Sequence, residues 1–204
     1  MQSTSFYKDF DFQVLNSGEF KEDAVREELI NPILKELGYK AYGINRIIYS
    51  KTLEHPFVKI GSKKRHINIV PDYLFQVDGK YTWVLDAKGP EENILTGDHK
   101  EQIYSYAIHP DIKADIFALC NGKEFIAYDK EKDKPLLFFQ LSEIDKHWEK
   151  IENLLSPDKF VEKQILSEPS PKKKQPDFSY LDLKLPKPIV PKKQSAARHF
   201  GVHG

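Results

Sequence analysis

The chain contains 204 residues, which is enough for one domain with a sizeable core but few for two. Its 31 Lys and Arg residues equal its 31 Asp and Glu residues, so the net charge neither favours nor excludes a polyanionic partner. The single cysteine, Cys120, excludes an internal disulfide framework, and no Cys and His spacing suggests a zinc site. The sequence lacks a signal-peptide pattern and any apolar run near the roughly 18 residues of a membrane span, so we expect a cytoplasmic protein with no membrane partner.

Charge is distributed unevenly along the chain. Residues 167–204 contain eight basic and three acidic residues, so this segment carries +5 and the preceding residues carry −5. Six prolines lie between Pro169 and Pro191 among runs of lysine, a composition typical of linkers and tails. We therefore predict a folded domain over residues 1–158 and a Pro/Lys-rich basic linker or tail over residues 159–204.

Hydrophobic periodicity predicts the elements of the folded domain. In chain order they are a helix over residues 19–39 ended by Gly38, strands over 44–49, 66–77 and 81–88, a loop and helix over 91–110, strands over 114–120, 123–129 and 135–141, and a helix over 142–155 with Ser142 as its N-cap. This order indicates an α/β fold with a central mixed β-sheet flanked by helices.

Three charged residues interrupt the apolar strands predicted at 66–77 and 81–88. Side chains alternate along a strand, so Asp86 and Lys88 share one face. An unpaired charge inside a buried strand costs several kcal/mol. Whether Asp72 joins the other two depends on the register of the hairpin, because a shift by one residue moves the facing side chains to the other side of the sheet.

The loop of this hairpin therefore decides whether the two aspartates meet. A two-residue Asp78-Gly79 loop places Asp72 opposite Leu85, on the wrong face. A three-residue loop with Gly79 at positive φ brings Asp72 to the face of Asp86. A one-residue bulge near Pro71, which cannot donate to a sheet ladder, has the same effect.

Two carboxylates held this close repel each other unless a cation lies between them. An oxygen-only pair suits Mg²⁺ or Mn²⁺, and a nearby lysine can orient or help to deprotonate a metal-bound water. The set of Asp72, Asp86 and Lys88 therefore indicates a site that hydrolyses a phosphodiester.

These residues also resemble the signature of the PD-(D/E)xK nuclease superfamily, with Pro-Asp at 71–72 and Asp-Ala-Lys at 86–88. Three further segments resemble the N-terminal nuclease domain of type I restriction enzyme motor subunits. Residues 22–39 match its Glu-x-x-x-Arg helix, residues 102–106 match its Gln-x-x-x-Tyr element, and residues 118–129 match its strand, Asn-Gly turn and strand. The resemblance implies a restriction-endonuclease-like PD-(D/E)xK core, so the predicted domain over residues 1–158 would be a nuclease domain.

The resemblance further implies roles for single residues. The implied metal ligands are Asp72, Asp86, Glu22 and the backbone carbonyl of Ala87; the implied catalytic residues are Asp72, Asp86, Lys88, Glu22 and Gln102; and the implied DNA-binding residues are Arg26 and Tyr106. Helix geometry separately places Glu22 and Arg26 on the apolar arc of the first helix and turns Glu27 and Glu28 away from it.

Each of these residues also has an ordinary structural interpretation. Asp86 and Lys88 can form a plain salt bridge, Glu22 and Arg26 an i,i+4 pair, and Gln102 and Tyr106 the polar edge of an amphipathic helix. The segment 197–204, "ARHFGVHG", resembles the entry to a DNA methyltransferase domain, which would make the chain part of a longer protein.

We expect a Mg²⁺-dependent DNA endonuclease of a restriction or defence system, with Mn²⁺ able to substitute. The expected partners are DNA and either restriction-modification subunits or a methyltransferase domain that follows on the same chain. The chain contains no GxxxxGK[ST] phosphate loop, so it has no translocating motor of its own. The alternative function is a non-cleaving DNA-binding or subunit-interaction module with a nuclease-like fold.

Overall fold

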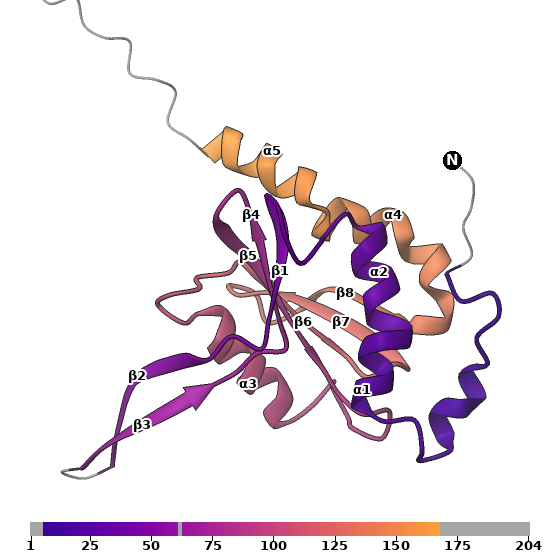
Figure 1. Cartoon of the computed structure of the whole chain (residues 1–204), viewed down its shortest axis with the longest axis horizontal. Coiled ribbons are helices and arrows are strands. Elements are labelled where there is room, and N and C mark those ends of the chain that lie inside the picture. Colours follow the sequence, from indigo (N-terminus) through magenta and orange to yellow (C-terminus); the bar gives the residue numbers. More distant parts are fainter. Residues whose placement is uncertain (1–5, 61–62, 168–204) are drawn as a thin grey trace, which may run out of the picture. The chain divides into compact units, whose positions relative to one another are not determined.

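A computed structural model describes residues 6–60 and 63–167 of the chain, all within one compact unit. The elements, of which Figure 1 labels the α-helices and the strands, are η1 (Phe12–Asn16), α1 (Glu22–Ala24), η2 (Val25–Ile30), α2 (Asn31–Glu36), β1 (Asn45–Tyr49), β2 (Leu53–Ile60), β3 (Lys63–Ile69), β4 (Tyr73–Val77), β5 (Lys80–Ala87), α3 (Asp98–Ala107), β6 (Ile116–Cys120), β7 (Glu124–Asp129), β8 (Pro135–Gln140), η3 (Leu141–Glu143), α4 (Ile144–Leu155) and α5 (Pro157–Ser167).

The fold is α/β, with a mixed central sheet flanked by helices, as the sequence predicts. Six strands form this sheet in the order β1-β4-β5-β6-β7-β8. Strands β5 and β6 are parallel, and the other neighbouring pairs are antiparallel. The remaining two strands, β2 and β3, pair only with each other and form a separate antiparallel ribbon.

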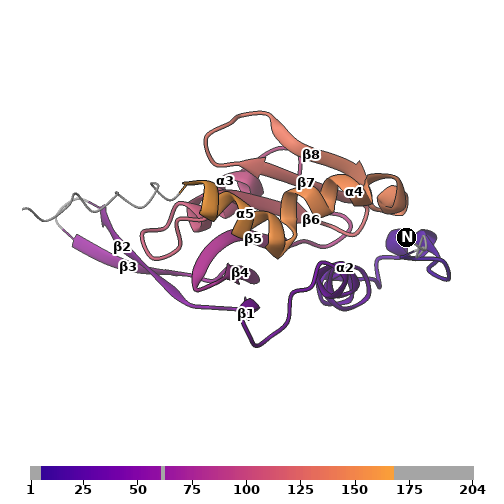
Figure 2. The same ribbon diagram turned by 90° about the horizontal axis from the view of Figure 1, so that it is seen from above.

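Each face of the sheet packs against its own set of helices, as Figure 2 shows from above. The larger core lies between the sheet and the helical segments α1 to α2 and α4. The smaller core lies under α3. Alternation along β5 assigns Trp83, Leu85 and Ala87 to the larger core and Val84 to the smaller one, so Asp86 belongs to the face that α3 covers.

The predicted first helix is confirmed over α1, η2 and α2, which run without a break from Glu22 to Glu36. Gly38 follows it at φ 90°. The N–H groups of Gly38 and Tyr39 donate to the carbonyls of Lys35 and Leu34, both at 3.0 Å. This is a Schellman motif, which satisfies the last carbonyls of the helix.

The hairpin between β4 and β5 has the odd shift that the site requires, but not where the sequence places it. Val77 pairs with Lys80 across a two-residue turn, so the expected three-residue loop is wrong. Asp78 and Gly79 both have positive φ, at 47° and 78°, which is the geometry of a type I′ turn. The register then shifts between Phe75 and Gln76, because β5 contains one extra residue there.

This bulge lies at Thr82, because Gln76 pairs with Tyr81 and Phe75 pairs with Trp83. The Thr82 hydroxyl donates to the carbonyl of Phe75 at 3.3 Å, and the Thr82 carbonyl accepts from the N–H of Asp115 at 3.1 Å. The extra residue is thus held by contacts on both sides. Beyond it the register runs Leu74 to Val84 and Tyr73 to Leu85, so the next pair is the two aspartates.

Three other expectations need correction. The strand predicted over 66–77 is interrupted after Ile69, because Pro71 cannot donate to a sheet ladder. Ser142 does not cap the closing helix, since a short 3₁₀ turn precedes α4 and Glu143 occupies the N-cap. The predicted boundary between residues 158 and 159 falls inside α5, whose Phe160 is buried in the larger core. Of the predicted tail, residues 168–204 lie outside the described residues.

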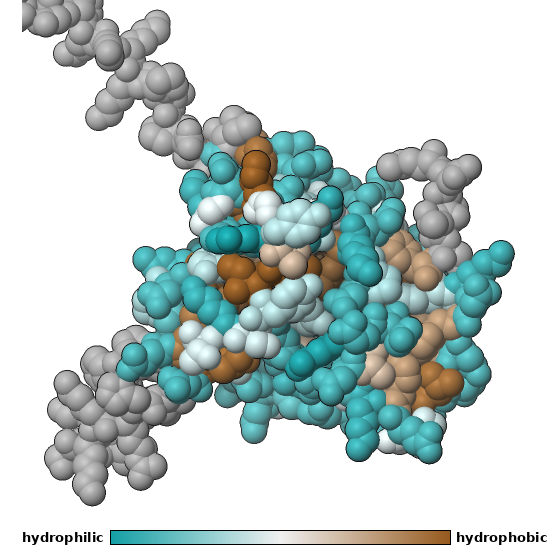
Figure 3. Space-filling model, in the orientation of Figure 1, coloured by the Kyte–Doolittle hydropathy of each residue, from teal (hydrophilic) through white to brown (hydrophobic). Residues whose placement is uncertain are grey.

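Hydrophilic residues cover most of the face shown in Figure 3. None of the helices in the described part of the chain is both long enough and apolar enough to span a membrane.

Candidate active site

Asp72 and Asp86 face each other where β4 begins and β5 ends. The backbone N–H of Ala87 donates to Oδ2 of Asp72 at 2.8 Å, and the backbone N–H of Asp72 lies 3.4 Å from Oδ1 of Asp86. The Asp72 and Asp86 side chains are 15% and 5% exposed. Two carboxyl groups are therefore held together in a largely desolvated position at one end of the sheet.

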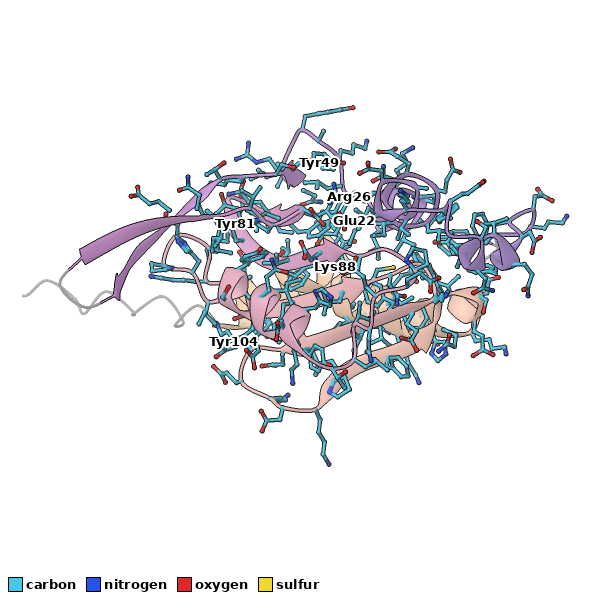
Figure 4. All side chains as sticks on the ribbon, turned by 90° about the horizontal axis from the view of Figure 1, so that it is seen from below. Glu22, Arg26, Tyr49, Tyr81, Lys88 and Tyr104 are labelled. Carbon is cyan, nitrogen blue, oxygen red and sulfur yellow. The ribbon has the colours of Figure 1, made fainter. Side chains whose placement is uncertain are left out.

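Two cations pair with these carboxylates. Arg26 lies 2.6 Å from Oδ1 of Asp72 and also pairs with Glu22, one helical turn before it. Lys88 lies 2.6 Å from Oδ2 of Asp86. In Figure 4, Glu22 and Arg26 point from the first helix toward the sheet, and Lys88 lies between them and α3. The charged residues predicted from the first helix and from the hairpin thus form one continuous network.

Arg26 belongs to η2, the π-helical part of the first helix. Single π turns inside helices occur frequently at functional sites, because they change the direction of a side chain. The Nε atom of Arg26 is buried and has no hydrogen-bond partner. The guanidinium is therefore positioned mainly by Glu22 and Asp72, with the exposed Asp23 at 3.8 Å, rather than by a complete set of hydrogen bonds.

The close carboxylates change the acidity of the site. Burial, and then the charge of Asp86, raise the pKa of Asp72 from 3.8 to about 6, although the N–H of Ala87 and Arg26 oppose this change. Burial lowers the pKa of Lys88, but the hydrogen bond to Asp86 and the negative charges of Asp86, Glu22 and Asp72 together outweigh that effect, so the pKa is raised. Lys88 is therefore a cation and a hydrogen-bond donor at neutral pH, and not a base.

Helix α3 closes the other side of the site. Oε1 of Gln102 lies 3.5 Å from Nζ of Lys88. Tyr106 is 5% exposed, and burial together with the nearby charge of Asp86 raises the pKa of its hydroxyl group. Its hydrogen bond with Gln102 acts in the opposite direction. Gln102 and Tyr106, one turn apart, therefore both reach the network around Asp86.

The turn between β6 and β7 holds the loop that follows Lys88. The Asn121 side chain accepts hydrogen bonds from the N–H groups of Lys123 and Glu124 and donates to the carbonyl of Glu92 at 2.9 Å. Glu92 in turn accepts a hydrogen bond from the N–H of Gly89 at 3.0 Å. The Asn-Gly turn that the sequence predicts thus fixes the chain directly after Lys88.

The structure joins most of the predicted site residues and adds two relationships that the sequence did not reveal. Glu22 is linked to Asp72 through Arg26, and Glu27 and Glu28 are exposed, as predicted. The pairing of Arg26 with Asp72 and the role of Glu92 in the loop were missed. A search for acidic residues at turn positions could have found Glu92, whereas the Arg26 contact joins residues 46 positions apart.

The residues present fit a hard divalent cation. Among the described residues, no group of three or more His, Cys, Asp and Glu side chains is arranged to hold a metal ion. Magnesium, however, usually binds through one or two carboxylates and completes its shell with water and substrate phosphate. Burial of Asp72, and then the charge of Asp86, raise the pKa of Asp72 to about 6, so the two carboxylates are ionised together only at a cost. A divalent ion between Asp72 and Asp86 would offset that cost.

Comparisons with known proteins leave the family of this chain open. No family model and no curated protein matches it. Among solved structures, the chain is similar to a fragment assigned to the HsdR subunit of a type I restriction enzyme from Vibrio vulnificus YJ016, with 20% sequence identity and a TM-score of 0.49. The match covers 70% of this chain and 25% of the other, so the chain spans about a quarter of that protein's length. The function must be inferred from the geometry of the site.

Proposed function

We propose that this chain is a Mg²⁺-dependent endonuclease domain of the PD-(D/E)xK type that hydrolyses DNA within a restriction or defence system. The observation that carries this proposal is the direct opposition of Asp72 and Asp86, with Lys88 2.6 Å from Asp86. The bulge at Thr82 produces this opposition. A strand surface that needed only a salt bridge would not require a second buried carboxylate beside the first.

In this proposal Asp72 and Asp86 hold the metal, with Glu22 and the carbonyl of Ala87 as further oxygen donors. When bound, Mg²⁺ would stabilise the charge that develops on the phosphodiester and supply an activated water. Because Mn²⁺ prefers similar oxygen ligands, it would substitute.

The protein's own side chains perform the remaining tasks. Lys88 keeps its proton, so it orients the attacking water and stabilises negative charge on the phosphate by donating hydrogen bonds. Gln102 holds Nζ of Lys88 toward α3. Arg26 holds the Asp72 carboxylate in position and provides a donor for a phosphate of DNA, and Tyr106 supports the same wall of the site.

One observation favours the second candidate, a DNA-binding or subunit-interaction module that does not cut. Arg26 and Lys88 already pair with the two aspartates, so the network has cations without any metal. In a non-cleaving module these pairs would be permanent and would serve stability.

Nicking of a supercoiled plasmid with Mg²⁺ and with EDTA separates the two candidates. An endonuclease converts the plasmid to the open-circular form only with Mg²⁺ or Mn²⁺. A binding module retards the plasmid on a gel in both buffers and leaves it supercoiled. Lys88→Ala is the companion variant, because it should abolish nicking and retain DNA binding.

A further inference from the structure

The β2–β3 ribbon extends away from the six-stranded sheet, as Figures 1 and 2 show. It makes no pairing with the sheet in the described part of the chain. Strand β3 ends at Ile69, only three residues before Asp72. The ribbon and the candidate active site are therefore consecutive along the chain.

The base of the ribbon is fixed in the smaller core. Leu53, opposite Ile69 in the ribbon, is 2% exposed and belongs to the cluster that contains Leu74 and Tyr106. The carbonyl of Glu54 is hydrogen-bonded to Nε2 of His109 at 3.0 Å. The direction in which the ribbon leaves the domain is thus set by the same core that underlies the site.

The distal half of the ribbon concentrates positive charge. Residues 53–69 contain four Lys and Arg residues against one Glu, so the ribbon carries +3, whereas residues 1–166 together carry −5. All four basic residues, Lys59, Lys63, Lys64 and Arg65, occupy the half farther from Asp72. A positive segment on an acidic domain is the charge distribution expected where a polyanion binds.

The register of the ribbon places basic residues at neighbouring positions on its two strands. Lys59 pairs with Lys64, and the neighbouring pairs are Val58 with Arg65 and Ile60 with Lys63. The four basic positions therefore occupy three consecutive pairs of the distal half, so one polyanion can meet both strands.

We propose that the distal half of the β2–β3 ribbon is an arm that binds the phosphates of duplex DNA flanking the scissile bond. This inference rests on the proposed function, because it places the arm relative to a phosphodiester at Asp72 and Asp86. Arg65 precedes Asp72 by seven residue steps, so along extended chain it lies at most about 25 Å from Asp72. At about 3.4 Å per base pair, that length corresponds to roughly seven base pairs of flanking duplex. A two-stranded ribbon also fits the major groove.

The salt dependence of DNA binding tests the arm in the full chain. The test variant carries Lys59→Gln, Lys63→Gln, Lys64→Gln and Arg65→Gln. The matched control removes the same charge from four exposed lysines outside the ribbon, Lys132→Gln, Lys134→Gln, Lys146→Gln and Lys150→Gln. Binding to a fluorescent duplex is measured by anisotropy in EDTA over a range of KCl concentrations. Each lost phosphate contact should reduce the slope of log K against log [KCl] by about 0.9.

We expect the slope to fall by about three to four in the ribbon variant and to stay within about one of the wild type in the control. The double variant Lys59→Gln/Lys64→Gln should reduce the slope by about two. This double variant keeps the inference testable if the fourfold variant folds poorly.

The outcomes for the arm and for the nuclease are distinct. The arm is overturned if the wild type binds duplex DNA and the ribbon variants leave the slope of log K against log [KCl] unchanged, whether or not the protein cuts. A ribbon-dependent slope without Mg²⁺-dependent nicking supports the arm as a DNA contact and rejects the nuclease. Equal loss of slope in the ribbon variant and in the control, or no binding of duplex DNA by the wild type, overturns the arm as well.

Discussion

The guanidinium of Arg26 lies 2.6 Å from Oδ1 of Asp72, on a carboxylate whose other oxygen accepts the N–H of Ala87. The residue that the motif marks as a metal ligand is therefore already paired with a cation. A divalent ion that binds there must weaken or share this contact. If the proposed function holds, Arg26 would therefore set how much Mg²⁺ the site needs.

Replacing Arg26 should reveal this competition. In Arg26→Gln the Mg²⁺ concentration that gives half of the maximal thermal stabilisation should fall about fivefold, because a competing ion pair worth about 1 kcal/mol is lost. Lys35→Gln, which removes an exposed cation from the last turn of α2, is the control and should leave this concentration unchanged. An equal Mg²⁺ requirement in wild type and Arg26→Gln would mean that the metal does not meet Asp72.

The raised pKa of Asp72 predicts a specific dependence of stability on pH. The folded protein binds a proton at Asp72 with a pKa of about 6, against an ordinary value of 3.8, so between these values it holds more protons than the unfolded chain. Stability from this group is therefore present at low pH and is lost as the pH rises from about 4 to 6. Two units correspond to at most roughly 3 kcal/mol.

Urea unfolding in EDTA at pH 4.5 and at pH 7 measures this effect. The free energy of unfolding of wild type relative to Asp72→Asn should fall across this interval, because only the wild type has the ionisable group. Addition of millimolar Mg²⁺ at pH 7 should restore the wild type and not the variant. A difference between the two proteins that is constant with pH would show that folding does not raise the pKa of Asp72.

Gly122 connects the β6–β7 turn to the helix that carries Arg26. It has φ 83°, and an added Cβ would lie 3.1 Å from side-chain atoms of both Val25 and Leu29. Gly122→Ala should therefore lower the free energy of unfolding by about 1–3 kcal/mol more than Gly79→Ala, which has a similar φ of 78° but nothing within 4 Å. Chemical denaturation of both variants separates the effect of crowding from that of backbone strain. Equal losses of unfolding free energy in the two variants would mean that the first helix moves away from the added Cβ without cost.

The sequence alone predicts most of the sheet because its strands are rich in β-branched and aromatic residues and bounded by turn formers. It also predicts that Asp72 and Asp86 meet if the register shifts once. The sequence does not predict the position of that shift, since Thr82 is an ordinary strand residue. Its carbonyl accepts a hydrogen bond from the N–H of Asp115, which directly precedes β6 and is distant in the sequence. Strand β2 was not predicted, because Pro56 lies inside it and argues against a strand, whereas the end of β3 falls within the strand predicted over 66–77.

The contact of Arg26 with Asp72 illustrates the same limit for the site. Helix periodicity correctly turns Arg26 toward the sheet, but the choice between Glu22, Asp72 and a phosphate depends on how the helix packs. The partner of Arg26 is therefore decided by tertiary structure and not by the local sequence pattern.

The rate of plasmid nicking by Asp86→Asn in saturating Mg²⁺ tests the central claim most directly. Asn keeps the shape of Asp86 and removes the charge that would hold the metal, while Glu27→Gln removes an exposed carboxylate from the first helix as the matched control. We predict Mg²⁺-dependent nicking by the wild type and by Glu27→Gln, and a loss of at least about 100-fold in Asp86→Asn, comparable to removal of one electrostatic contributor in other enzymes. Nicking by Asp86→Asn at the wild-type rate, or no nicking by the wild type with Mg²⁺ or Mn²⁺, would contradict the assignment of this site.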